Sequence, residues 1–228
     1  MRPLSVLLCL LALLLAAGCG DDEQSAGEAE VTATPAATEA STETGCTKVE
    51  APESKGPGKL SKPSEALDPK KTYTATVGTS CGEFKIALDV ERAPKTAASF
   101  AYLAREGFYD DTTFHRIVPG FVIQGGDPLG NGMGGPGYGV VETPPQSLRY
   151  TRGVVAMAKA GTEPAGASGS QFFVVTGEDA GLPPDYALLG KVSEGQDVVD
   201  TIGVSATDPS TEMPIDPVVI ESVTIEEG

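Results

Sequence analysis

The stretch that decides the fold and the function is FHRIVPGFVIQGGD, residues 114–127. It places a charged side chain, Arg116, inside an apolar run, and a second apolar run that begins at Phe121 contains Gln124. Successive side chains of a strand alternate between its two faces, so Arg116 is expected to point away from both of its neighbours. The Pro-Gly pair at 119–120 predicts a turn that folds the two runs together and brings the glutamine amide to the guanidinium.

Taken alone, residues 114–127 favour a structural interpretation, in which backbone carbonyls or a surface ion pair satisfy the arginine. A second block comprises residues 155–160 (VAMAKA) and 169–173 (GSQFF), and a third, residues 182–192, reads LPPDYALLGKV. With these blocks in this order and spacing, residues 72–228 resemble the cyclophilins, which are peptidyl-prolyl cis-trans isomerases. Three ordered blocks are much rarer by chance than one short motif.

The fold is expected to be mainly β. Alternating or continuous apolar runs between Gly and Pro turns predict strands, and helical spacing after Pro94 and Gly195 predicts two helices. The strands are expected at residues 72–77, 83–89, 113–118, 121–124, 154–158, 171–176, 188–192 and 217–226, and the helices at residues 94–107 and 195–202. The resemblance implies a closed eight-stranded antiparallel β-barrel capped by two helices, with the active site on its outer face.

The resemblance also implies roles for individual residues. Arg116 is similar to the family's catalytic arginine, and Gln124 to the glutamine that orients it. The implied substrate-binding residues form a proline pocket and a stretch whose backbone holds the peptide, and they are Phe121, Val122, Ala158, Lys159, Ala160, Gln171, Phe173, Leu182 and Tyr186. Three of these differ from the commoner family residues, which are Met at 122, Asn at 159 and His at 186. The chain has no Trp, which the family often has near position 181.

The implied reaction is rotation about the amide bond before a proline. Because no covalent bond is made or broken, we expect no nucleophile, metal or cofactor, and the substrates are proline-containing polypeptides. An alternative interpretation is a non-catalytic binding or chaperone module that holds proline-containing segments in the same groove.

The composition argues against several other classes of protein. The net charge is −16, from 16 basic and 32 acidic residues, which disfavours nucleic-acid binding. A single histidine disfavours a histidine-based metal site. Residues 78–82 (GTSCG) match the serine-hydrolase elbow and residues 130–135 (GNGMGG) match a dinucleotide-binding loop, but neither motif is followed by the helix that its chemistry requires.

The N-terminal residues predict export and membrane anchoring. Residues 1–18 combine an early Arg with a short apolar run that ends in small residues, as in a signal peptide. The small residues directly before Cys19 resemble the lipobox of bacterial lipoproteins, in which that cysteine is lipidated; the alternative is an ordinary signal peptide with a coincidental cysteine. Residues 19–45 are acidic and lack aromatic residues, which predicts a disordered tether. We therefore expect an extracytoplasmic protein, lipid-anchored to the outer face of the cell membrane.

The two cysteines that remain are Cys46 and Cys81, and export would place them in an oxidising compartment. A disulfide between them would close a loop of 36 residues, 46–81 inclusive, and stabilise the fold by about 4 kcal/mol in the chain-entropy model. It would pin the extended segment 46–71 against the first strands of the barrel. We expect the chain to be a monomer.

Overall fold

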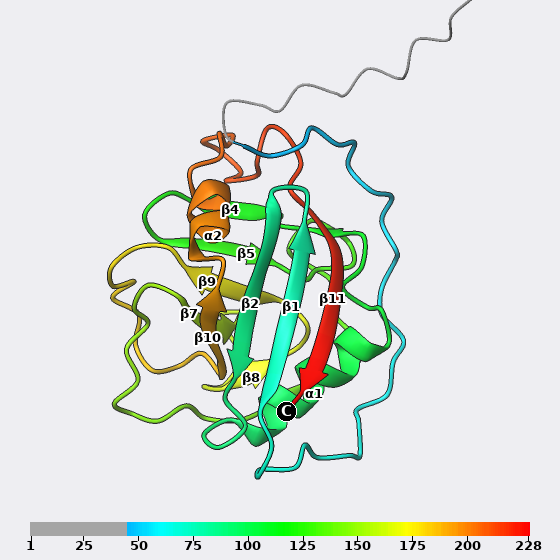
Figure 1. The fold of residues 1–228 in the computed structure, drawn as a ribbon, viewed down its shortest axis with the longest axis vertical. Helices are drawn as coiled ribbons and strands as arrows, with labels where there is room; N and C mark the ends of the chain where they lie inside the picture. Colours follow the sequence, from blue (N-terminus) through cyan, green and yellow to red (C-terminus); the bar gives the residue numbers. More distant parts are fainter. Residues whose placement is uncertain (1–44) are drawn as a thin grey trace, which may run out of the picture. The chain divides into compact units, whose positions relative to one another are not determined.

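A curled antiparallel sheet of nine strands, with one helix near each end, forms the body of the molecule (Figure 1). The computed structural model describes residues 45–228. The predicted signal peptide, the predicted lipidation site Cys19 and the predicted tether up to residue 44 therefore lie outside the described residues. The prediction of a mainly β fold with two helices is confirmed.

The strand order in the sheet is β3-β11-β1-β2-β10-β7-β9-β5-β4, and β6 and β8 form a separate pair. The elements are β1 (Tyr73–Thr79), β2 (Gly82–Leu88), α1 (Pro94–Arg105), β3 (Thr112–Thr113), β4 (Arg116–Val118), β5 (Val122–Gly125), β6 (Val140–Val141), β7 (Val154–Met157), β8 (Ala167–Ser168), β9 (Phe172–Val175), β10 (Leu188–Glu194), α2 (Gln196–Gly203) and β11 (Val219–Glu227). The sequence predicts all of these elements except β6 and β8, although it merges β3 and β4.

The sheet does not close, so the expectation of a closed eight-stranded barrel is wrong. Its two edges are β3 and β4, which are consecutive in the chain but are not hydrogen-bonded to each other as strands. The predicted strand at 113–118 breaks between them, at Phe114 and His115. Both of these neighbouring side chains are buried, with exposed fractions of 0% and 6%. The ladder is interrupted at these two residues, which lie between the pairing of β3 with β11 and the pairing of β4 with β5.

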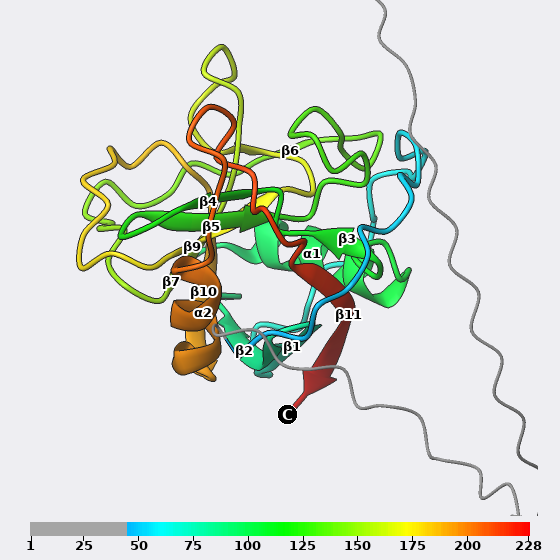
Figure 2. The same ribbon diagram turned by 90° about the horizontal axis from the view of Figure 1, so that it is seen from above.

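The core lies inside the curl of the sheet (Figure 2). Seen from above, β4, β5 and β9 lie on one side, and β1 and β2 lie on the other. Along β9, Phe172 and Val174 point into this core, whereas Phe173 belongs to a smaller apolar cluster on the outer face. Strand alternation therefore builds two apolar layers from one strand, and the outer layer forms the floor of the site described below.

The turn between β1 and β2 contains the sequence that matches the serine-hydrolase elbow. The Thr79 hydroxyl donates a hydrogen bond to the carbonyl of Gly82 (2.6 Å), as expected of a tight hairpin turn. Ser80 is buried, and its Oγ accepts a hydrogen bond from the backbone N–H of Val219 (3.1 Å). This hydrogen bond links β11 to the hairpin. Ser80 is followed by strand β2 and not by the helix that the serine-hydrolase elbow requires.

Residues 46–71, which we call the strap, contain no helix or strand and run along the outside of the domain (Figure 1). At the start of the strap, the sulfurs of Cys46 and Cys81 lie at bonding distance, 2.04 Å. Further along, the backbone N–H groups of Gly58 and Leu60 donate to the carbonyls of Gly135 (3.1 Å) and Pro136 (2.9 Å). The strap therefore contacts residues 130–136, which we call the glycine-rich loop, as well as the first hairpin. Within residues 45–228, no helix has the length and apolar character needed to cross a membrane.

Candidate active site

A cavity of about 180 Å³ opens on the outer face of β5, β7 and β9. Nine of the eleven predicted catalytic and substrate-binding residues line it, and together they combine one guanidinium with several apolar walls. These residues are Arg116, Phe121, Val122, Gln124, Ala158, Lys159, Phe173, Leu182 and Tyr186. The structure thus brings together side chains from residues 116 to 186 of the chain in a single pocket.

Two aromatic rings of this pocket, those of Phe173 and Tyr186, pack against each other and against Tyr150. Phe173 is only 4% exposed, and its ring packs edge-on against that of Tyr186, with 5.5 Å between the ring centroids. Tyr150 lies beneath them, and its hydroxyl donates to the carbonyl of Tyr186 (2.6 Å) and accepts from the N–H of the same residue (3.0 Å). Burial raises the pKa of Tyr150 to about 12, so the hydroxyl stays protonated and remains a donor at neutral pH. Tyr150 was not predicted from the sequence, because a buried tyrosine carries no motif of its own.

Arg116 lies at the rim of the pocket, on the short edge strand β4. It pairs with Gln124 across β4 and β5, so both side chains stand on the same outer face. The Arg116 side chain is 34% exposed, and its Nε donates to the Oε2 of Glu212 at 2.5 Å. Glu212 was not predicted from the sequence, because nothing distinguishes this acidic residue from the many others in the chain.

Gln124 does not make the contact that was predicted for it. Its Nε2 donates to the Oε1 of Gln171 (3.0 Å), and among the described residues its amide makes no hydrogen bond with Arg116. A charged carboxylate is a stronger acceptor for the guanidinium than a neutral amide. Glu212 therefore takes the position next to Arg116 that the sequence analysis gave to Gln124.

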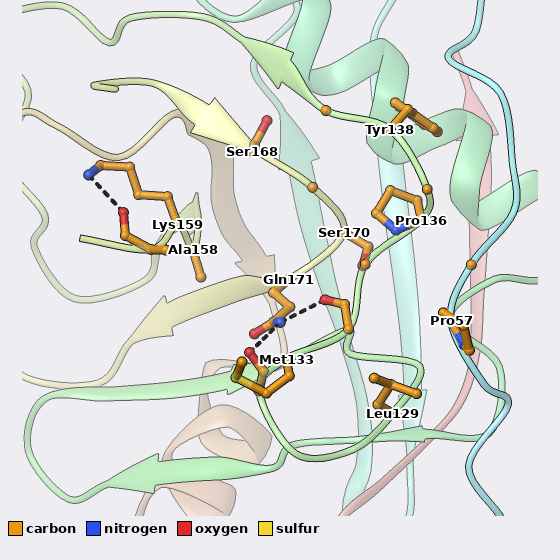
Figure 3. A pocket seen from close by; sticks show the side chains of 18 of the residues that line it. Pro57, Leu129, Met133, Pro136, Tyr138, Ala158, Lys159, Ser168, Ser170 and Gln171 are labelled. Atoms are coloured by element: carbon orange, nitrogen blue, oxygen red, sulfur yellow. Dashed lines mark hydrogen bonds between the residues drawn. The ribbon is translucent and has the colours of Figure 1, made fainter. Parts of the chain in front are cut away.

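The other two predicted residues, Ala160 and Gln171, line a larger neighbouring cavity of about 770 Å³ (Figure 3). The two cavities adjoin, because they share three lining residues, Gln124, Ala158 and Lys159. Pro57 and Gly58 of the strap form part of the far wall, which sequence reasoning did not predict.

The glycine-rich loop in this wall is held from both sides. The Nε2 of Gln171 donates to the carbonyls of Gly132 (3.0 Å) and Gly134 (2.9 Å), as Figure 3 shows. The buried carboxylate of Asp127 accepts hydrogen bonds from the backbone N–H groups of Leu129 and Gly132. The loop is therefore a fixed wall of the groove, and no helix follows it that could bind a phosphate.

The stretch 158–160 was predicted to hold a peptide through its backbone. The N–H of Ala158 donates to the carbonyl of Gln171 (2.9 Å), and the N–H of Ala160 donates to the carboxylate of Glu163 (2.6 Å). The ammonium of Lys159 lies 5.5 Å from the ring centroid of Tyr186. A peptide that pairs with the N–H of Ala160 must therefore displace the carboxylate of Glu163.

His115, the only histidine, predicts a pH dependence of stability. Burial lowers its pKa, although the nearby carboxylate of Asp127 opposes this shift. Below the unfolded pKa of about 6.5, the unfolded chain therefore takes up a proton that the folded protein does not. We expect the free energy of unfolding to fall as the pH drops below about 6.5, by at most about 1.36 kcal/mol per pH unit from this group.

The measurement is urea unfolding of wild type and of His115→Gln between pH 7.5 and pH 5. Because the carboxylates titrate in both proteins, the difference between the two curves isolates the histidine. Parallel curves across this range would contradict the buried, neutral histidine.

Comparisons with known proteins match this chain to the family that its sequence blocks resemble. Residues 74–225 match the family model described as "Cyclophilin type peptidyl-prolyl cis-trans isomerase/CLD". Peptidyl-prolyl cis-trans isomerase A of Mycobacterium tuberculosis is 42% identical over 175 residues, which cover 69% of this chain and 94% of that protein. Peptidyl-prolyl cis-trans isomerase B of Streptomyces anulatus is 41% identical over 170 residues, covering 67% of this chain and 95% of that protein.

A solved structure agrees with the observed fold. The crystal structure of a cyclophilin-type isomerase from Cryptosporidium parvum, determined in the presence of the dipeptide Ala-Pro, superposes with a TM-score of 0.62 at 32% sequence identity. The match covers 67% of this chain and 98% of that one.

Proposed function

The chain belongs to the cyclophilin-type peptidyl-prolyl cis-trans isomerases, and from this membership we propose that it acts on exported proteins as they fold, at the outer face of the cell membrane. The observation that supports the chemistry best is the single pocket in which the Arg116 guanidinium borders the apolar side chains of Phe121 and Phe173. The observation that supports the location is the N-terminal sequence, with its apolar run and Cys19.

The task of the enzyme is to lower the barrier to rotation about the X–Pro amide bond, about 18–20 kcal/mol. Amide resonance makes the bond planar, and the transition state is a twisted amide in which that resonance is lost. The twisted amide has a lone pair localised on the prolyl nitrogen. Only interactions that are stronger in this twisted form than in the planar form raise the rate.

Arg116 supplies such an interaction. Its Nε is occupied by Glu212, so the two Nη groups are the donors left for the prolyl nitrogen and the neighbouring carbonyl. A preorganised donor of this kind contributes about 3–4 kcal/mol, by comparison with one donor of an oxyanion hole. A 10⁵-fold acceleration needs about 7 kcal/mol, so positioning of the substrate must supply the remainder.

The apolar walls supply the positioning. Phe121, Phe173 and Leu182 present apolar side chains to the pocket, which suits the ring of a proline. Phe173 and the underlying Val122 are almost fully buried, so this floor does not yield when the substrate moves. The ring is held while the residue before it rotates, and the larger neighbouring cavity receives the preceding part of the peptide.

Membrane anchoring is tested by replacing Cys19. We expect wild type to sediment with membranes and to have a mass above that of residues 19–228, because of the added acyl chains, which together give stable anchoring. Cys19→Ser should lose both properties and should keep its isomerase activity. A wild-type protein with an unmodified N-terminal cysteine and no membrane association would contradict the anchoring proposal.

The same mass measurement tests the disulfide. We expect Cys46 and Cys81 to be alkylated only after reduction, and Cys46→Ser provides the control, since it leaves one thiol that reacts without reduction. Alkylation of both cysteines in the unreduced protein would contradict the bond.

A further inference from the structure

Glu212 lies in the loop between α2 and β11, far from every sequence block that points to the active site. Its Oε2 accepts a hydrogen bond from the Nε of Arg116 at 2.5 Å, and the two side chains are only partly exposed, 43% for Glu212 and 34% for Arg116. The backbone makes a second contact, because the N–H of Ile117 donates to the carbonyl of Glu212 (2.9 Å). Glu212 therefore contacts both Arg116 and the next residue of β4.

The turn that carries Glu212 is well defined. The Oδ1 of Asp208 accepts hydrogen bonds from the hydroxyl of Ser210 (2.6 Å) and from the N–H of the same residue (2.7 Å). The backbone of Asp208 bonds to both Glu212 and Met213, at 2.8 and 2.9 Å. These contacts close a compact turn that presents the carboxylate at a fixed place beside β4.

The backbone of Glu212 adopts a conformation that side chains seldom take. Its φ is +59°, and among the described residues Asp111 is the only other non-glycine with a positive φ. Such a conformation is unfavourable for a non-glycine residue and persists where the surroundings impose it. A glycine would take this φ without cost, but it would lack the carboxylate that reaches Arg116.

We propose that Glu212 is a positioning residue for the isomerisation, which holds the Arg116 guanidinium by its Nε and keeps both Nη groups directed at the substrate. Gln124 does not perform this task in the structure: its Nε2 donates to Gln171, and among the described residues its Oε1 accepts no hydrogen bond from Arg116. A free arginine side chain has several rotatable bonds, so without Glu212 the donors would spend part of their time outside the productive geometry. This inference rests on the catalytic role of Arg116 and is independent of membrane anchoring.

The opposite effect is also physically possible, because a carboxylate partly neutralises the guanidinium and so weakens its pull on the substrate. Three substitutions separate the two effects. Glu212→Gln keeps an acceptor oxygen and removes the charge, whereas Glu212→Ala and Glu212→Gly both remove the acceptor. The glycine variant also relieves the backbone conformation, so agreement between the alanine and glycine variants shows that the lost side chain, and not a distorted turn, causes the effect.

The experiment measures kcat and KM for X–Pro isomerisation in the full mature chain. We expect kcat to fall about tenfold in both Glu212→Ala and Glu212→Gly with little change in KM, and to stay within about threefold of wild type in Glu212→Gln. The Nε–H resonance of Arg116 in a ¹⁵N–¹H spectrum should remain distinct in Glu212→Gln and broaden in the other two. Glu221→Ala, which removes an exposed carboxylate of β11, should match wild type in every measurement.

A double-mutant cycle completes the test. In an Arg116→Ala background, Glu212→Ala should have no further effect on kcat, because a residue that acts through the guanidinium has nothing left to position. Unchanged or raised kcat in Glu212→Ala and Glu212→Gly would overturn the proposal. So would equal losses in the Arg116→Ala and wild-type backgrounds. If Arg116→Ala alone left the rate unchanged, the catalytic assignment itself would fail, and this result is distinct from the others.

Discussion

Replacing Arg116 with alanine is expected to lower kcat/KM by about 10²- to 10³-fold, the loss that follows removal of one preorganised donor. Arg116 borders the pocket beside Phe121 and Phe173 and can donate charged hydrogen bonds towards a twisted amide held there. The ammonium of Lys159, the other cation of the pocket, donates to the carbonyl of Glu163. The substitution removes a partly exposed side chain from an edge strand, so the free energy of unfolding should change little. The measurement is the rate of a proline-limited refolding reaction, together with a peptide isomerisation assay.

Two further variants make the result specific. Arg116→Lys keeps the positive charge but loses the planar fork, so we expect it to recover only a small part of the activity. Arg92→Ala removes an exposed arginine that pairs with Asp89 before α1, and it should have wild-type rates. Equal rates for wild type and Arg116→Ala would favour the non-catalytic binding module over the enzyme.

Replacing Phe172 with alanine is expected to lower the free energy of unfolding by about 3–5 kcal/mol. Its side chain is completely buried, and its ring packs against those of Phe100, Tyr109 and Phe114, with centroid separations of 5.6, 5.9 and 6.0 Å. These partners come from α1 and from the segment around β3, so the cavity would open where the helix meets the sheet. Surrounding rings cannot easily collapse into such a space, which places the expected loss in the upper part of the range for core substitutions.

Urea unfolding of Phe172→Ala and of Phe121→Ala measures this effect. Phe121 is the matched control, because its ring borders the pocket and is only partly buried. We expect Phe121→Ala to lose substrate affinity with a much smaller loss of stability, whereas Phe172→Ala should lose stability and keep its activity where it remains folded. Similar losses of stability in the two variants would contradict the division between an inner core and an outer site.

The sequence predicts the parts of the site that depend on strand alternation. Once residues 121–124 are recognised as a strand, Val122 and Gln124 must share a face, and the structure places both in the pocket. The closure of the barrel could not be predicted this way, because it depends on whether β3 and β4, the two edges of the sheet, pair with each other. That outcome is a property of tertiary packing and not of the local pattern.

The contacts that the sequence did not predict all come from loops. Glu212 and the strap residue Pro57 have no periodicity, and each reaches the site only because a distant part of the chain is folded next to it. Gln124 illustrates the same limit from the other side. Its position was predicted, but its hydrogen-bond partner was not, because the loop residue Gln171 is brought beside it only in the folded chain.

The shortness of β3 and β4 has a consequence for a protein that meets unfolded polypeptides. An open sheet normally exposes unpaired backbone groups along its outer strands, and these groups can recruit any extended chain nearby into an aggregate. Here the outer strands have only two and three residues, and the carbonyl of Glu212 already caps the N–H of Ile117. A sheet with such short edges offers an extended polypeptide little backbone to pair with, which lowers the risk of co-aggregation.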